Sequence, residues 1–279
     1  MTDLSVTAHL TLPAEWEPHE ATWIAWPHNT SDWPGKFHPI PWVYAEIARK
    51  IAEGELLRVL VNSSDHRDRA ISVLKRAGAD LSRIEFFSVP TNRGWTRDFG
   101  PIFVRRIAAA EPPCNVIIRC QFNAWAKYPD WQLDNAVSAK VAAEFGYPIV
   151  EAEVKGQGIV LEGGAIGVNG AGDLLTTEEC LLDASMQARN PNLNRGEIEG
   201  ALRSFFGATN VLWLGRGIAG DDTHGHIDDL CRFTGARTVV LCQEADANDE
   251  NYRPLQENRE RLEGMRLADG SRPEVVPLP

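Results

Sequence analysis

Three polar residues lie at equal intervals in the sequence, and each begins an apolar segment. They are Asp98, Glu162 and His226, spaced 64 residues apart. A constant interval indicates three copies of one structural unit, because a repeat holds each position in register. We expect each copy to place its polar residue at the same end of a strand. Copies arranged around an axis would bring these three strand ends together.

Segments typical of strands and of helices alternate along the whole chain. Continuous apolar runs predict strands, and apolar residues recurring every three or four positions predict helices. Pairs of strands recur between helices, which favours repeated ββαβ units of the α/β class over a Rossmann sheet. No Ser/Gly-rich linker divides the sequence, so we expect residues 1–279 to form a single domain. The expected strands include 21–27, 56–62, 98–106, 159–168, 174–182 and 227–233, and the expected helices include 41–54, 131–145 and 195–206.

The composition is typical of a soluble globular protein and excludes several other classes. Hydrophobic residues make up 43% of the chain and charged residues 24%, unlike a disordered protein. No apolar run approaches the roughly 18–20 residues needed to span a membrane, and residues 1–12 do not resemble a signal peptide. The five cysteines contain no CxxC pair, which predicts a reducing cytoplasm rather than a disulfide framework. They are residues 114, 120, 180, 231 and 242.

The net charge of −11 bears on the kind of partner. An acidic chain is poorly suited to the phosphate backbone of a nucleic acid. It is compatible with a cationic small molecule, although many acidic proteins carry such a charge for solubility alone. We therefore expect a small-molecule partner rather than a nucleic acid or a membrane.

The densest polar cluster is the segment 220–229, which holds two histidines and four aspartates. A solvated acidic loop is the simplest interpretation. A metal site is the second, because His224-Gly-His226-Ile-Asp228 resembles the HxHxD motif of metallo-β-lactamase-like hydrolases. Such zinc sites need further ligands later in the chain, and no histidine follows His226. This counts heavily against zinc.

A third interpretation combines the cluster with the two earlier repeats. A guanidinium group is planar, presents a fixed fork of N–H donors, and can be held by carboxylates through paired hydrogen bonds. Asp98, Glu162 and Asp228 supply the acceptors, and His226 supplies an acid–base group that works near neutral pH. In an extended strand, His226 and Asp228 would lie on the same face. Taken alone, Asp98 could instead cap a strand, and Glu162 could precede a tight turn.

Two further requirements follow from guanidinium chemistry. We expect Trp95 and Trp125 to flank the cationic head and the alkyl chain of the ligand. Hydrolysis at the guanidinium carbon also needs a strong nucleophile, and a thiolate would serve.

Seven motifs in order show a family resemblance that covers nearly the whole chain. The sequence resembles the agmatine deiminase and bacterial-type peptidylarginine deiminase family, within the guanidine-modifying superfamily. Together the motifs are highly specific, although no single one is. The matching stretches are 12–27, 95–101, 122–125, 161–164, 176–182, 189–191 and 220–229.

The resemblance implies an α/β fold, the five-bladed pentein propeller of ββαβ units. It also implies hydrolysis of a guanidinium to a ureido group and ammonia, without a metal or other cofactor. By this resemblance Asp98 and Asp228 would bind the guanidinium, and His226 would be the general acid and base. Glu162 would support His226 or the substrate, and Asp222 is a weaker candidate for contact with the remote end of the substrate.

The sequence departs from the family pattern at its end. Family members carry a catalytic cysteine near the C-terminus, in a Gly-rich segment ending in His-Cys, and none of the five cysteines stands in such a context. A further 64-residue step would pass Pro279, so we expect about four of five blades, without the nucleophile. An open ring would favour self-association or a partner chain. A smaller departure is Ala126, at a position where glycine is frequent in the family.

Agmatine deiminase activity, yielding N-carbamoylputrescine and ammonia, is the favoured function, with negligible hydrolysis expected from this chain alone. Three alternatives remain: a peptidylarginine or arginine deiminase, a non-catalytic guanidinium-binding protein, and a zinc hydrolase using the HxHxD cluster.

Overall fold

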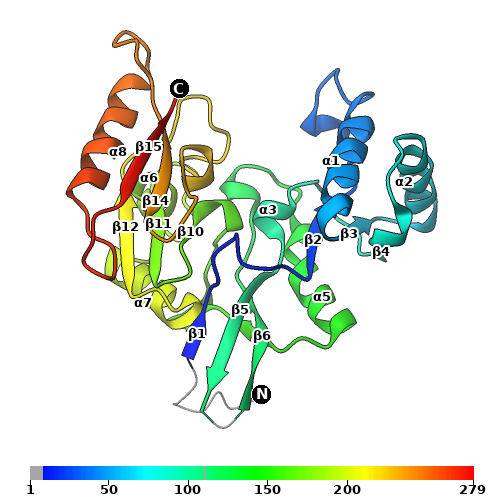
Figure 1. Ribbon diagram of the computed structural model, residues 1–279, viewed down its shortest axis with the longest axis horizontal. Coiled ribbons are helices and arrows are strands. Elements are labelled where there is room, and N and C mark those ends of the chain that lie inside the picture. The colour runs from blue at the N-terminus through cyan, green and yellow to red at the C-terminus, as the bar shows by residue number, and fades with distance from the viewer. Residues whose placement is uncertain (1–8, 110) are drawn as a thin grey trace.

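The computed structural model describes residues 9–109 and 111–279. Within these ranges, four sheets of three or four strands surround a central region that contains the short helix α3 (Figure 1). The larger helices α2, α5, α7 and α8 lie at the periphery. No helix of the described ranges combines the length and apolar character that crossing a membrane requires.

Three of the sheets share one topology. In each, two antiparallel strands are followed by a helix and by a third strand, which pairs parallel to the second. This arrangement confirms the ββαβ unit expected from the strand pairs that recur between helices. The units are β5 (Ile102–Ala108), β6 (Glu111–Arg119), α5 (Val137–Phe145) and β7 (Ile149–Glu151); β10 (Gly167–Val168), β11 (Asp173–Thr177), α7 (Arg195–Phe206) and β12 (Asn210–Leu214); and β13 (Cys231–Phe233), β14 (Thr238–Cys242), α8 (Tyr252–Gly264) and β15 (Glu274–Leu278).

The fourth sheet contains only parallel pairs. Its strand order is β2-β3-β4, with α1 and α2 as the connecting helices. Strand β3 is almost entirely buried, as its continuous apolar sequence requires in a parallel sheet. The elements are β2 (Ala21–Ala25), α1 (Ile40–Gly54), β3 (Leu56–Val61), α2 (Ser64–Arg76) and β4 (Ile84–Ser88).

The remaining elements are short. Strand β1 (His9–Thr11) pairs antiparallel with β5, and β8 (Glu153–Val154) forms a two-stranded sheet with β9 (Gln157–Gly158). The short helices are α3 (Thr96–Phe99), α4 (Gln132–Asn135) and α6 (Glu178–Leu182), with the 3₁₀ turns η1 (Thr30–Asp32), η2 (Leu81–Arg83), η3 (Ala124–Ala126), η4 (Gly163–Ala165) and η5 (Ile227–Asp229). The number of propeller blades and the single-domain assignment stay predictions.

The expected strand starts at the three repeated polar residues were wrong. Asp98 lies in α3, and Glu162 and His226 come directly before η4 and η5. A single helical turn therefore contains Asp98 and follows Glu162 and His226, and each strand begins after that turn. Because Asp228 lies inside η5, His226 and Asp228 are not neighbours on one strand face.

The strand expected over 174–182 also ends early. Strand β11 stops at Thr177, whose hydroxyl accepts a hydrogen bond from Cys180 N and caps helix α6. Threonine at this position satisfies a backbone donor of the first helical turn. The second half of the apolar run is therefore helical, and it carries Cys180 toward the centre of the molecule.

The helix expected over 195–206 is confirmed. Asn194 and Glu197 form a reciprocal capping box at the start of α7, and Gly207 ends the helix in the left-handed conformation with φ of 69°. Both signals are local, which explains why the sequence places this helix correctly.

Candidate active site

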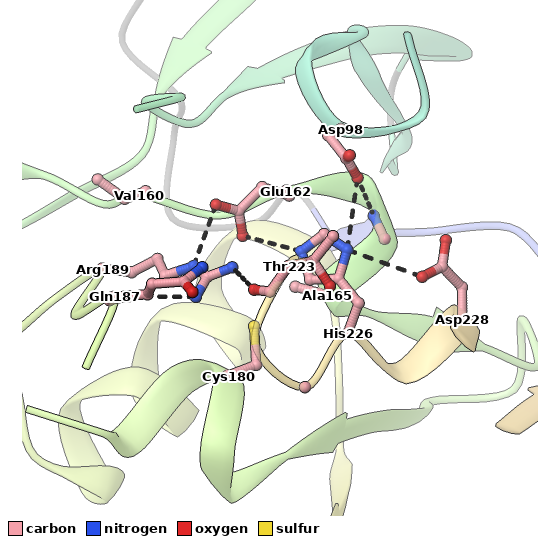
Figure 2. A network of polar contacts seen from close by, with 12 residues as sticks. Asp98, Val160, Glu162, Ala165, Cys180, Gln187, Arg189, Thr223, His226 and Asp228 are labelled. Carbon is pink, nitrogen blue, oxygen red and sulfur yellow. Dashed lines mark hydrogen bonds and ion pairs between the residues drawn. The ribbon is translucent and has the colours of Figure 1, made fainter. Parts of the chain in front are cut away.

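The three repeated polar residues meet at the centre of the fold (Figure 2). Asp98 comes from α3, Glu162 from the segment before η4, and His226 from the segment before η5. Gly164 makes this approach possible. A Cβ there would lie 2.7 Å from Asp98 Oδ1 and would collide with His226 Nδ1, and the Gly164 N–H donates to Asp98 Oδ1 at 3.2 Å.

His226 lies at the centre of the site, and both nitrogens of its ring are near carboxylate oxygens. Its Nδ1 atom lies 3.6 Å from Asp98 Oδ1 and 3.7 Å from Asp228 Oδ1, and its Nε2 atom lies 3.5 Å from Glu162 Oε2. The His226 side chain is only 2% exposed. Asp98 and Asp228 thus face one ring nitrogen together, whereas Glu162 faces the other alone.

Glu162 also forms a buried ion pair with Arg189, for which the sequence predicted no role. Arg189 Nε donates to Glu162 Oε1 at 3.3 Å, and both side chains are 0% exposed. The remaining guanidinium donors bind the carbonyl oxygens of Gln187 and Thr223. Arg189 therefore holds Glu162 in place and compensates its charge. The family motif at 189–191 marked Arg189 in the sequence. Its distance along the chain from Glu162 gave no indication that the two side chains form an ion pair.

Burial and neighbouring charges shift the pKa values in the site. Burial, assisted by the charges of Glu162 and Asp228, raises the pKa of Asp98 to about 7. Burial tends to raise the pKa of Glu162, but the Arg189 guanidinium and the contact with His226 together outweigh it and lower that pKa. Burial alone would lower the pKa of His226, but contact with Glu162 and the charge of Asp98 raise it overall. The site therefore favours a protonated imidazole beside ionised Glu162.

Asp228 lies at the more open side of the site. Its side chain is 22% exposed, and its Oδ2 atom lies 3.4 Å from Arg97 Nε. Arg97 in turn pairs with Glu15 at 2.7 Å, and Glu15 also binds Arg232. Arg97 therefore pairs with Asp228 and Glu15 rather than with the adjacent Asp98.

Aromatic side chains lie near His226, and their expected contact with a ligand stays a prediction. The Trp95 and Trp125 rings lie 4.4 Å apart between centroids, and the Trp125 ring stands edge-on to His226 at 6.2 Å. Trp125 belongs to a run of three non-glycine residues with positive φ, from Ala124 to Ala126. Asp222 binds the neighbouring Lys127 and Tyr128 side chains, so its contact with a substrate stays a prediction.

Of the three residues of the HxHxD motif, His226 and Asp228 contact each other, whereas His224 has other partners. His224 Nε2 lies 3.0 Å from Asp183 Oδ2, and its Nδ1 lies 3.8 Å from Glu179 Oε1. His226 faces different carboxylates, as described above. The geometry therefore gives no support to a zinc hydrolase built on His224, His226 and Asp228.

The comparisons with known proteins agree with this geometry. The family model for Porphyromonas-type peptidyl-arginine deiminase matches residues 11–279. The chain is 35% identical to agmatine deiminase of Ectopseudomonas mendocina (strain ymp), covering 96% of this chain and 70% of that protein. It is also 35% identical to agmatine deiminase of Stutzerimonas stutzeri (strain A1501), covering 93% and 67%.

Solved structures show the same relationship. Agmatine deiminase of Enterococcus faecalis superposes with a TM-score of 0.83 at 30% identity, covering 97% of this chain and 70% of the other. A substrate-bound agmatine deiminase of C. jejuni superposes with a TM-score of 0.81 at 31% identity, covering 98% and 75%. The fold agrees with the α/β propeller implied by the sequence motifs. The chain belongs to the Porphyromonas-type peptidyl-arginine deiminase family.

Proposed function

We propose that this chain binds the guanidinium group of agmatine and contributes the acid–base machinery for its hydrolysis to N-carbamoylputrescine and ammonia. The observation that carries the proposal is the position of His226, with Asp98 and Asp228 both facing its Nδ1 atom. The relatives and solved structures reported above are named agmatine deiminases, which supports agmatine as the substrate.

The two carboxylates account for guanidinium binding. Asp98 and Asp228 offer several oxygen acceptors on one side of the imidazole, and a guanidinium presents its N–H donors in one plane. Charge-assisted hydrogen bonds of this kind are worth roughly 1.5–3 kcal/mol each. A guanidinium held between them would turn its central carbon and its amino groups toward His226.

His226 then carries the protons. In the proposed reaction a cysteine thiolate attacks the guanidinium carbon, and the imidazolium donates its proton to the nitrogen that leaves as ammonia. Neutral His226 next removes a proton from water, which attacks the same carbon and releases the thiolate and the ureido product. Glu162 would keep the ring oriented, and Arg189 would keep Glu162 ionised.

We propose that none of the five cysteines of this chain supplies that thiolate. Cys180 and Cys231 are 1% exposed, and burial raises the pKa of both thiols, that of Cys231 to about 12. Burial also raises the pKa values of the Cys120 and Cys242 thiols. Cys114 lies in β6, which is not among the elements that form the site. A thiolate is the reactive form, so we expect binding without appreciable hydrolysis from this chain alone.

Two measurements on the purified chain test the proposal. We expect calorimetry to detect agmatine binding, and we expect Asp98→Asn and Asp228→Asn each to weaken it about 10- to 100-fold. Asp68→Asn, on the exposed surface of α2, should leave the affinity unchanged. Unaltered binding in both site variants would refute the site. Ureido product formed at an enzymatic rate, and lost in one Cys→Ser variant, would refute the claim about the nucleophile.

The identity of the guanidinium substrate and the cellular location of the protein are further parts of the proposal. The family description also names peptidyl-arginine, so peptidyl-arginine and free arginine are the competing ligands in the same titration. We further propose a cytoplasmic location, since all five cysteines are free thiols and a reducing compartment keeps them so. Self-association stays a prediction for analytical ultracentrifugation.

A further inference from the structure

A cluster on the other side of His226 from Asp98 combines a carboxylate, a thiol and an imidazole. Ligand atoms of Glu162, Cys180 and His226 all lie within 4.8 Å of one another. These residues are 0%, 1% and 2% exposed, respectively. They come from three separate segments, namely the residues before η4, helix α6 and the residues before η5 (Figure 2). The proposed deimination uses His226 and Glu162, but it gives no role to the Cys180 thiol beside them.

Two atoms of this cluster have no polar partner in the described part of the chain apart from each other. Among the described residues, Glu162 Oε2 and His226 Nε2 are buried and make no hydrogen bond, and they lie 3.5 Å apart. Buried polar atoms almost always have a partner. The other oxygen of Glu162 is already used by Arg189, and the other nitrogen of His226 faces Asp98 and Asp228. Glu162 Oε2 and His226 Nε2 therefore face each other at 3.5 Å and are free to turn toward a common ligand.

We propose that Glu162, Cys180 and His226 form a binding site for a thiophilic divalent cation such as Zn²⁺ or Cd²⁺. Sulfur, imidazole nitrogen and carboxylate oxygen are the ligand types that Zn²⁺ takes, at about 2.0–2.3 Å. In a tetrahedral site such ligands lie roughly 3.3–3.8 Å apart. Small side-chain rotations would bring donor atoms that already lie within 4.8 Å to these separations.

The charges of the site suit such an ion. On binding, the Cys180 S–H bond and the His226 Nε2–H bond break, both protons pass to solvent, and sulfur–metal and nitrogen–metal bonds form. The thiolate and the Glu162 carboxylate then balance the two positive charges of the ion, while His226 binds as a neutral ligand. Arg189 keeps its contact with the other oxygen of Glu162. A thiolate donor selects Zn²⁺ or Cd²⁺ over Mg²⁺ and Ca²⁺, which prefer oxygen ligands.

The site would act as an inhibitory switch on the same histidine. A metal ion at Nε2 takes the place of Glu162 as the partner of that nitrogen and prevents His226 from becoming an imidazolium in its usual orientation. The metal and a reactive guanidinium complex would therefore exclude each other. The metal site does not rest on agmatine being the substrate, because its ligands lie on the opposite side of the imidazole.

Cadmium provides a direct test on the full chain without any substrate. Chelator-treated protein is titrated with Cd²⁺, and binding is followed by the thiolate-to-cadmium absorption band in the ultraviolet. We expect one ion per chain with this band. Cys180→Ala should abolish the band and weaken binding at least about 10-fold. Cys231→Ala is the matched control, since its thiol is equally buried but lies outside the cluster, and it should bind as the wild type does.

Three outcomes would overturn the proposal: no stoichiometric binding, binding without a thiolate band, or a band that survives in Cys180→Ala. Should Cys180→Ala fail to fold, the ¹¹³Cd resonance of the wild-type complex decides the question. A single thiolate with nitrogen and oxygen ligands supports the site, whereas an all-oxygen or multi-thiolate shift refutes it. Calorimetry with agmatine remains a separate readout, so failure of the metal site leaves the proposed function to its own test.

Discussion

Removing the charge of Glu162 should reveal how strongly the fold depends on the buried pair with Arg189. Glu162→Gln keeps the size of the side chain but leaves the Arg189 guanidinium, 0% exposed, without its carboxylate. Breaking a buried ion pair in this way costs roughly 3–5 kcal/mol. Because Arg189 retains the carbonyl oxygens of Gln187 and Thr223, we expect a loss near the lower bound, about 3 kcal/mol.

Urea unfolding at pH 7, followed by circular dichroism, measures this loss. In a chain of this size about 3 kcal/mol corresponds to a fall in Tm of roughly 6–12 °C. Replacing both partners, in Glu162→Gln with Arg189→Met, should recover much of the stability, because no uncompensated charge is then buried. Glu263→Gln, which breaks the exposed pair with Arg259, serves as the control and should unfold like the wild type. A Glu162→Gln variant as stable as that control would refute the reasoning.

Three further changes have defined outcomes. Burial raises the pKa of Asp134 to about 7, so the folded state binds its proton more tightly than the unfolded state. Stability from this group should therefore fall as pH rises from about 4 to about 7, and Asp134→Asn should remove that fall in parallel urea titrations. Gly164→Ala should abolish agmatine binding in calorimetry, because its Cβ would displace Asp98 and His226, whereas Gly54→Ala, with open space around its Cβ, should bind normally. Ala126→Gly should raise the free energy of unfolding by about 1 kcal/mol, because Ala126 has a φ of 55° that glycine adopts without strain; no gain in thermal unfolding would contradict that.

The sequence predicted the repeat and the meeting of its polar residues. The 64-residue interval placed Asp98, Glu162 and His226 at equivalent positions, and the structure brings Asp98 and Glu162 each within 4 Å of His226. The equal spacing predicts this meeting because residues at the same position in each repeat occupy equivalent places around a common axis. The chemical roles of these residues stay predictions for the experiments above.

Local geometry at each repeat was harder to predict. The apolar runs after Asp98, Glu162 and His226 look like strands from their first residue, yet each begins with one helical turn. Such turns are stabilised by contacts between units, including that of Gly164 N with Asp98. The pattern of hydrophobic residues along the sequence carries no information about these contacts.

Long-range partners could not be read from spacing at all. Arg189 reaches Glu162 across 27 positions, and Arg97 bypasses the adjacent Asp98 to reach Glu15. The approach of Cys180 to His226 depends on how α6 packs against the third unit. These contacts follow from the closing of units around the centre, which is a property of the folded chain.

The most direct test of the central claim compares agmatine with putrescine by calorimetry on the wild-type chain. Putrescine keeps the aliphatic chain and one amine but replaces the guanidinium with a second amine. Our account predicts one agmatine per chain, bound at least about 10-fold more tightly than putrescine, because Asp98 and Asp228 recognise the guanidinium fork. Equal affinity for the two ligands, or no binding of agmatine, would contradict it.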